Sequence, residues 1–178
     1  MKQRLLILLL LISTIGFSQE QVSTPSFSDF TQFEISLPLQ GNKNRGQEFP
    51  DGTSNDNWFL PDGINANFGY GIHYKKILGL SANTGIGMKL SEKLIIAPVF
   101  ANLRIMPQED EETRLGVDLG LGQSFALGRG NLQGTFQRAK LNLESDGRQI
   151  FIEFVSYGIS FNNSNQQSIS IGIALVSF

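Results

Sequence analysis

Apolar residues alternate with small or polar residues along most of this chain, and this period-two pattern constrains the fold more than any other feature. It is clearest in residues 64–74, where aliphatic and aromatic side chains alternate with Asn, Gly and His, and in residues 80–90. Alternation of this kind predicts strands with one apolar face and one small or polar face. Each of these runs has about 11 residues, which matches the ~9–11 residues of a tilted membrane strand and exceeds the ~5–6 of most soluble strands.

The same pattern predicts an all-β chain of eight antiparallel strands joined by turns. Pro98 lies inside the fourth segment, where it removes a ladder hydrogen bond and predicts a bulge or irregular pairing. The sequence Ser145-Asp-Gly-Arg148 predicts a hairpin turn, and the polar residues 40–63 predict a long loop. The predicted strands are Phe30–Leu39, Ile64–Tyr74, Leu80–Leu90, Lys93–Ile105, Arg114–Leu127, Leu132–Leu143, Ile150–Phe161 and Ser168–Phe178.

Residues 1–18 have the composition of a cleavable secretory signal peptide. A basic n-region precedes an apolar stretch over residues 5–12, and small residues precede Gln19, where we expect cleavage. The apolar stretch is too short for a spanning helix, which needs about 20 residues. We therefore expect an exported chain with a polar lead-in over residues 19–28 and a barrel domain over residues 29–178.

Charge and composition argue against several other classes of protein. Without the signal peptide, the chain keeps 12 basic and 16 acidic residues and has a formal charge of −4. This charge argues against nucleic-acid binding, which needs a basic surface. The 19 Gly disfavour long helices, and no stretch after the signal peptide reaches the ~18 apolar residues of a membrane helix. Because there is no Cys, disulfides cannot supplement the core of this exported chain.

Two sequence stretches carry a family resemblance. The stretch from Phe68-Gly-Tyr-Gly71 to Ile95-Ile-Ala-Pro-Val-Phe-Ala-Asn-Leu-Arg104, and a leader that ends Phe-Ser before Gln19, resemble the small outer-membrane β-barrel proteins of Gram-negative bacteria. These are the eight-stranded opacity-like or OmpA-membrane-domain-like proteins, in their Bacteroidetes version. The resemblance covers nearly the whole mature chain and implies an up-and-down transmembrane barrel in the outer membrane. It also implies that the barrel assembly machinery recognises the final aromatic residue, Phe178.

The last predicted strand contains an irregularity. Its aliphatic residues occupy odd positions, whereas Phe178 falls on the even register with Ala174 and Val176. Either a late bulge returns Phe178 to the aliphatic face, or the end of the strand is apolar on both faces. We expect this strand to pair with Phe30–Leu39 and close the barrel, with irregular structure near Phe178.

The polar faces of the strands predict what fills the lumen. Lys or Arg on a lipid face costs about 2–4 kcal/mol near mid-membrane, so the strand charges are expected inside or near an interface. An eight-stranded barrel is just wide enough for side chains to fill it, so we expect a polar plug and no open pore. Tyr70, Tyr74, Trp58 and Phe59 are expected in aromatic girdles at the membrane interfaces. The residues expected inside are Lys89, Arg104, Asp118, Arg138, Lys140, Asn65, Asn67, Asn83 and Asn102.

The candidate chemical sites lack the residue spacing that their chemistry needs. His73, the one histidine, could serve a lipid-modifying enzyme together with a Ser and an acid, but no spacing ties it to a nucleophile. The loop Asp51–Asn57 offers oxygen ligands for Ca²⁺ without the ligand order of an EF-hand, and Glu109–Glu112 is expected to be a solvated turn. We therefore expect no catalytic, cofactor-binding or metal-binding residues.

Three functions remain open. The first is an integral outer-membrane β-barrel protein with a structural or surface-interaction role, surrounded by outer-membrane lipid, with residues 40–63 available to an extracellular ligand. The second is a soluble exported barrel of the lipocalin type that binds a small apolar ligand inside. The third is a lipid-modifying enzyme that uses His73. The first two differ in polarity, because a membrane barrel turns its aliphatic faces outward and a soluble barrel turns them inward.

Overall fold

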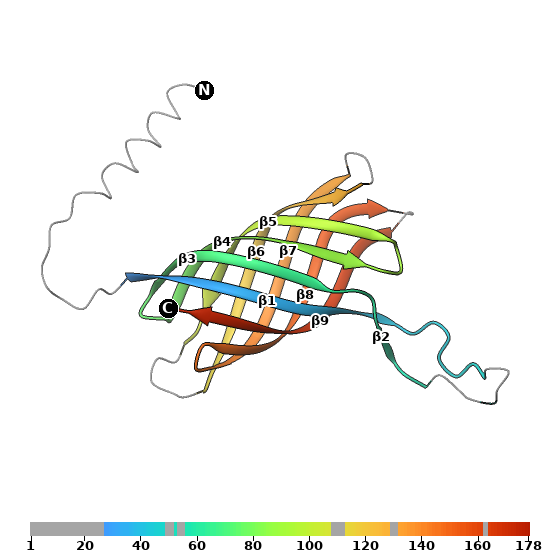
Figure 1. Ribbon diagram of the computed structural model, residues 1–178, viewed down its shortest axis with the longest axis horizontal. Helices are drawn as coiled ribbons and strands as arrows, with labels where there is room; N and C mark the ends of the chain where they lie inside the picture. Colours follow the sequence, from blue (N-terminus) through green and yellow to red (C-terminus); the bar gives the residue numbers. More distant parts are fainter. Residues whose placement is uncertain (1–26, 49–51, 53–55, 108–112, 129–131, 162–163) are drawn as a thin grey trace, which may run out of the picture.

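The computed structural model describes residues 27–48, 52, 56–107, 113–128, 132–161 and 164–178. These residues form nine strands, of which eight wrap into a barrel and one, β2, is a short addition outside it (Figure 1). The strands are β1 (Phe27–Gly41), β2 (Phe59–Pro61), β3 (Asn65–Tyr74), β4 (Leu78–Lys89), β5 (Leu94–Ile105), β6 (Thr113–Leu127), β7 (Gln133–Ser145), β8 (Arg148–Phe161) and β9 (Ser164–Ser177).

Several predicted features fall outside the described residues: the signal peptide over residues 1–18, the turn Glu109–Glu112 and most of the loop Asp51–Asn57. β1 begins at Phe27, so Phe27 and Ser28 belong to the first strand and not to the polar lead-in. No helix long and apolar enough to cross a membrane occurs in the described part of the chain.

The barrel closes because its first and last strands pair. β1 pairs with β3, each strand from β3 to β9 pairs antiparallel with the next, and β9 returns to β1. The closing ladder runs from Thr31 opposite Ser177 to Leu39 opposite Ile169. This register confirms the predicted pairing of the first strand with the last. Closure removes the open sheet edges that would otherwise pair with other chains.

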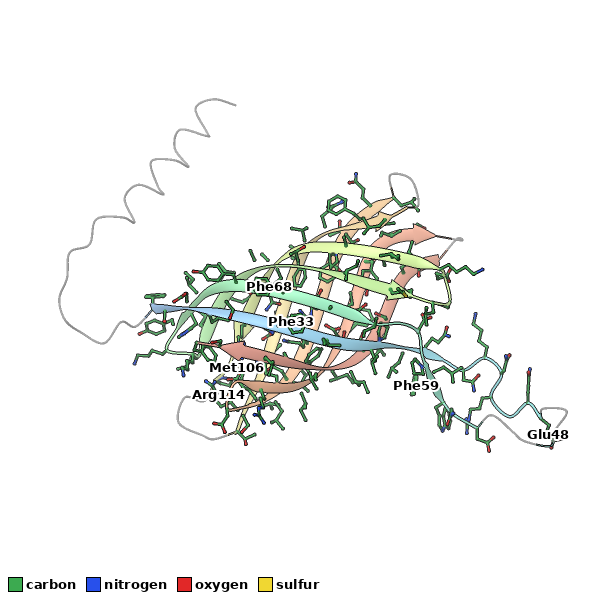
Figure 2. All side chains as sticks on the ribbon, viewed as in Figure 1. Phe33, Glu48, Phe59, Phe68, Met106 and Arg114 are labelled. Carbon is green, nitrogen blue, oxygen red and sulfur yellow. The ribbon has the colours of Figure 1, made fainter. Side chains whose placement is uncertain are left out.

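Along each barrel strand, successive side chains point alternately to the outer surface and into the lumen. On β9, Ile173 is 62% exposed and its neighbour Ala174 is 3% exposed. Phe33 on β1 and Phe68 on β3 are paired and lie on the outer surface, 44% and 51% exposed (Figure 2). The cause is the pleat, which points successive side chains to opposite faces of the sheet. All eight barrel strands follow this arrangement, with aliphatic residues outside.

The barrel has two rims. The terminal rim holds Phe27, Phe178 and the turns at residues 75–77 and 146–147. The opposite loop rim holds the turn at residues 90–93 and the connection from β1 to β3, whose described residues 42–48, 52 and 56–64 project away from the barrel on the right of Figure 1 and are called the segment 42–64. β2 lies in this segment and pairs with the end of β1, from Leu39 opposite Pro61 to Gly41 opposite Phe59. The prediction of a loop over residues 40–63 missed this strand.

The hairpin between β7 and β8 has the predicted turn. Asp146 and Gly147 have φ values of 49° and 71°, and two positive φ values in a two-residue turn define type I′. A Cβ on Gly147 would lie 2.5 Å from the carbonyl oxygen of Val176, so glycine is also required for space.

The end of β9 differs from the prediction. The β1–β9 ladder stays in register to Ser177, so the expected irregularity near Phe178 is wrong and Phe178 remains on the inner register. Val176 is buried while Leu175 is exposed, so the strand end is apolar on both faces. The register shift lies at the other end of this strand pair, between Ser156 and Ser160 of β8.

Pro98 interrupts its ladder without forming a bulge. The β4–β5 pairing stops after Thr84 opposite Val99 and resumes at Gly87 opposite Ile96 in the same register. Thr84 Oγ1 donates a hydrogen bond to Pro98 O over 3.2 Å at this gap. Irregular pairing was therefore the correct alternative at Pro98, because the missing N–H removes a bond but adds no residue.

Candidate functional site

Charged side chains gather inside the barrel between its middle and the terminal rim. They come from β1, β5, β6, β7 and β8, because alternate residues of each strand share the inner face. Burial is nearly complete for most of them, and Asp118 is 0% exposed. We call this set the lumenal charge cluster: Glu34, Arg104, Arg114, Asp118, Arg138, Lys140, Glu144 and Glu153.

The middle of the cluster is organised around Glu34. Its Oε2 lies 2.6 Å from Arg138 Nη2, and its Oε1 lies 2.6 Å from Lys140 Nζ. Lys140 Nζ also lies 2.6 Å from Asp118 Oδ2, and Arg138 Nε lies 2.7 Å from Glu153 Oε2. β1 and β7 are not adjacent in the sheet. The two pairs of Glu34 therefore cross the lumen, whereas the pairs of Asp118 and Glu153 join neighbouring strands.

Near the terminal rim the cluster is organised around Glu144. Its carboxylate accepts hydrogen bonds from both Arg104 and Arg114. Gln149 joins the two parts of the cluster, since its Nε2 donates to Glu144 Oε2 over 2.6 Å and its Oε1 accepts from Lys140 Nζ over 3.4 Å. The cluster contains four cations and four anions, so its formal charges balance. This balance matters because an unpaired buried charge is strongly destabilising.

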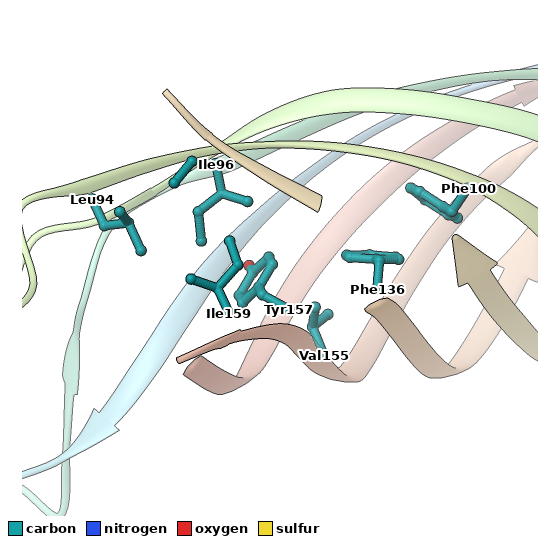
Figure 3. Close-up of a cluster of buried hydrophobic side chains, with 8 residues drawn as sticks. Leu94, Ile96, Phe100, Phe136, Val155, Tyr157 and Ile159 are labelled. Atoms are coloured by element: carbon teal, nitrogen blue, oxygen red, sulfur yellow. The ribbon is translucent and has the colours of Figure 1, made fainter. Parts of the chain in front are cut away.

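A layer of apolar side chains fills the lumen on the loop-rim side of the charges (Figure 3). The rings of Phe100 and Phe136 have centroids 4.5 Å apart, and Tyr157 packs 5.9 Å from Phe136. Ser124 Oγ donates a hydrogen bond to the backbone carbonyl oxygen of Tyr157. We call this set the lumenal apolar layer: Leu94, Ile96, Phe100, Ala126, Phe136, Val155, Tyr157 and Ile159.

Little space remains between the apolar layer and the wall formed by β3 to β5. A cavity lined by Asn65, Pro98, Phe136 and other inner residues has a volume of about 10 Å³. This is at most the space of a single water molecule, which needs about 10–15 Å³ measured in this way.

The residues predicted to face inward are buried, apart from Asn67, which is half-buried. They do not form the single hydrogen-bonded plug that was expected, because their hydrogen-bond partners differ. Asn65 Nδ2 donates to Ser36 Oγ over 3.3 Å, and Ser36 Oγ donates to Glu153 Oε1 over 2.8 Å, so Asn65 reaches the charge cluster indirectly. Asn83 Nδ2 donates instead to Ser81 Oγ of its own strand over 2.9 Å.

Lys89 lies apart from the charge cluster, at the loop rim. Its Nζ donates to Gln166 Oε1 over 3.0 Å and to Gln167 O over 3.1 Å, which joins β4 to β9 across the barrel end. Two neutral oxygen acceptors thus hold this buried cation.

His73 lies at the terminal rim and faces the lumen. Its ring contacts Phe178 edge-on, with centroids 4.9 Å apart, and its Nδ1 accepts a hydrogen bond from Lys76 N over 3.0 Å. Phe178 also lies under Lys76 Nζ, 4.7 Å from the ring centroid, and near Arg104, 5.6 Å from the centroid. Among the described residues, no Ser or carboxylate forms a hydrogen bond with the His73 side chain. The nucleophilic triad that the enzyme hypothesis requires is therefore not assembled in this part of the chain.

Asp62 fixes the projecting segment to the loop rim. Although it lies in a connecting segment it is 2% exposed. Its carboxylate accepts hydrogen bonds from Ser91 N over 2.7 Å and from Ser91 Oγ over 2.8 Å. Its backbone N donates to Pro38 O over 2.7 Å. Asp62 thus ties together β1, the segment 42–64 and the turn at residues 90–93.

The predicted girdle aromatics occupy three different positions. Tyr74 ends β3 at the terminal rim, Tyr70 lies on the outer face of the same strand, and Trp58 and Phe59 belong to the projecting segment. Trp58 is 67% exposed and carries Arg45 on its ring face, 3.3 Å from the centroid.

Sequence reasoning missed the apolar layer and half of the charge cluster. Phe100 and Phe136 share the register of Asn102 and Arg138, so the parity of each position carried the necessary signal. The prediction considered only the polar residues of this face and so left out Phe100 and Phe136. The lumen is therefore mixed, with charges toward the terminal rim and apolar side chains toward the loop rim, and not polar throughout.

Comparison with known proteins adds information about the fold alone. No protein-family model and no curated protein sequence matches this chain. Among solved structures, Neisserial surface protein A matches 84% of this chain and 97% of its own with a TM-score of 0.57 and 10% identity. The Yersinia pestis outer membrane protein Ail, in a phospholipid bilayer nanodisc, matches 84% of this chain and 100% of its own with a TM-score of 0.47 and 10% identity. The chain is a closed, eight-stranded, antiparallel up-and-down β-barrel that shares its architecture with Neisserial surface protein A.

Proposed function

We propose that this protein is an integral outer-membrane β-barrel protein with a structural or surface-interaction role. The observation that carries the proposal is the polarity of the wall. Leu80, Leu121 and Ile173, on three different strands, are 55%, 62% and 62% exposed on the outer face, while Arg104 and Lys140 are 1% exposed inside. Soluble proteins rarely expose an apolar band that encircles the molecule. Hydrocarbon accepts such a surface and requires a closed barrel.

The same polarity disfavours the soluble lipocalin-like alternative. A barrel of that kind needs an apolar cavity for its ligand, whereas this lumen holds ion pairs and a packed apolar layer. The cavity of about 10 Å³ beside the apolar layer is far below the ~300 Å³ of small ligand pockets. In the proposed function the lumen is therefore a support for the wall, without an open pore and without catalysis.

The rims suggest how the barrel sits in the envelope. With the terminal rim in the periplasm, the segment 42–64 lies at the cell surface. There Asp62 holds its base while Trp58 and Phe59 stay exposed, which suits contact with an extracellular ligand. Recognition of Phe178 by the assembly machinery would have to precede closure, because in the folded barrel its ring packs against His73.

Cell fractionation combined with electrophoresis tests the membrane proposal. We expect the protein in the outer-membrane fraction, with a mobility that shifts when the sample is boiled, because a closed barrel resists unfolding by detergent. Recovery in the soluble periplasm without a heat-dependent shift would contradict it. The closed lumen has a separate test in planar bilayers, where steady single-channel conductance by the folded protein would overturn that part of the proposal.

A further inference from the structure

The outer face of β6, β7, β8, β9 and β1 is hollowed into a trough. Three adjoining hollows, of about 720, 680 and 440 Å³, follow one another along this wall. The first two share Ile150 and Ile173, and the second and third share Leu141 and Ile152. The trough begins at the β7–β8 hairpin on the terminal rim and ends beside Ala139.

The walls of the trough are formed by outward side chains of neighbouring strands in register. Ile150 of β8 lies opposite Leu143 of β7 and opposite Ile173 of β9, which in turn lies opposite Ile35 of β1. One such row follows another along the strands. At the far end, Ala139 lies opposite Phe154 and is the smallest of the outward residues that line the hollow, so its short side chain leaves space there.

The length of the trough matches one leaflet of a bilayer. Along β8 it extends from Arg148 to Phe154. At about 3.3 Å for each residue this distance is about 20 Å. With a strand tilt of about 40°, it becomes about 15 Å along the membrane normal. That value is half of the ~30 Å hydrocarbon core, so an acyl chain of one leaflet can lie in the trough.

The polar end of the trough carries two opposite charges. Arg148 and Asp146 line the hollow at the hairpin, together with Ser145. Neither charged side chain forms an ion pair within the described residues. A guanidinium binds phosphate through charge-assisted hydrogen bonds, and a carboxylate binds an ammonium group in the same way. This pair of charges suits a headgroup that contains both a phosphate and a primary ammonium.

We propose that the trough is a specific site for a zwitterionic phospholipid of the leaflet next to the terminal rim. Arg148 binds its phosphate, Asp146 binds its ammonium, and an acyl chain lies along the trough in contact with Ile150 and Ile173. The inference rests on the proposed membrane location and adds a defined lipid class and residues to it.

Native mass spectrometry of the detergent-extracted barrel tests this site. The probes are phosphatidylethanolamine and phosphatidylglycerol with the same acyl chains, added in equal amounts. Wild type should retain one phosphatidylethanolamine at least about tenfold better than phosphatidylglycerol, since each headgroup contact is a charge-assisted hydrogen bond. Arg148→Gln should lose retention of both lipids. Asp146→Asn, which keeps a residue that tolerates positive φ, should lose only the preference between them.

Matched controls separate the site from general effects of charge or size. Lys75→Gln removes a cation from the β3–β4 hairpin of the terminal rim and should retain lipid as wild type does. Ala139→Phe fills the far end of the trough and should weaken retention, whereas Ala82→Phe, at an outward position of β4, should not.

Equal retention of the two lipids by wild type, or unchanged retention by Arg148→Gln and Ala139→Phe, would overturn the lipid site. The heat-dependent mobility shift is recorded for every sample. If wild type shows the shift but no lipid preference, the site fails and the membrane barrel stands. If wild type shows no shift, the proposed function itself fails.

Discussion

Glu34 on β1 and Arg138 on β7 form an ion pair across the lumen, with 2.6 Å between Oε2 and Nη2. β8 and β9 separate their strands in the sheet, so the pair links walls that share no backbone hydrogen bonds. Glu34 also lies 2.6 Å from Lys140 Nζ, and one carboxylate therefore serves two buried cations. We therefore expect the stability of the barrel to depend on this carboxylate more than on an exposed charge.

Glu34→Gln should destabilise the folded barrel. The change leaves Arg138 and Lys140 with less negative charge in a buried site, and breaking such a pair costs about 3–5 kcal/mol. The free energy of unfolding, from urea titration in detergent micelles or lipid vesicles, measures the loss. The control is Glu48→Gln in the exposed segment, which should change it by less than about 0.5 kcal/mol. Equal effects of the two variants would show that the cluster contributes nothing specific.

Leu119→Arg places a charge on the outer face of β6, at a position that is 46% exposed in the barrel. If lipid surrounds this face, the change should cost about 2–4 kcal/mol when the protein folds into vesicles. Gln137→Arg provides the comparison, because Gln137 is an outward residue of β7 that is already polar. Its cost should be clearly smaller than that of Leu119→Arg, because the change replaces a side chain that is already polar. A soluble barrel would tolerate both changes alike, and that outcome would count against the membrane location.

Phe136→Ala removes the ring at the centre of the lumenal apolar layer, between Phe100 and Tyr157. Truncation of a buried Phe leaves a cavity and should lower the free energy of unfolding by about 3–5 kcal/mol. Phe154→Ala is the matched change on the outer face, where Phe154 is 46% exposed. It should cost less, because lipid chains fill the space that the ring leaves. If the outer variant costs as much as the inner one, the layer is not a core.

Asp62→Ala should release the projecting segment from the loop rim. The change removes both hydrogen bonds to Ser91, and we expect protease to cleave the segment 42–58 at least several times faster while the barrel stays intact. Ser91→Ala removes only the hydroxyl contact and keeps the bond from its backbone N, so its effect should be intermediate. Limited proteolysis followed by mass spectrometry gives the rates. Identical rates for wild type and Asp62→Ala would mean that Asp62 does not hold the segment.

The sequence was sufficient to predict the strands and the closure of the barrel. Within residues 64–74 and within residues 80–90 the alternation is unbroken, and the structure has β3 and β4 there. The pairing of the first strand with the last also followed from the pattern, because a membrane barrel leaves no strand edge unpaired. These features depend on local periodicity, which can be recognised from the order of neighbouring residues alone.

The contents of the lumen were only partly predictable. Arg138 and Lys140 were expected inside from their parity, but nothing near them in sequence identifies Glu34, more than 100 residues away, as their partner. The apolar layer was missed for a related reason. The parity of Phe100 matches that of the inward Asn102, but composition alone does not separate the faces when both carry apolar residues.

By itself the sequence determined the number and order of the barrel strands and the face on which most of their side chains lie, because these follow from a period of two. Only the tertiary structure decided which charges meet, that Phe178 turns inward against His73, and that the wall of β7 to β9 is hollowed. Those relationships depend on the stagger and curvature of the closed sheet, which bring residues of distant strands to the same height in the barrel.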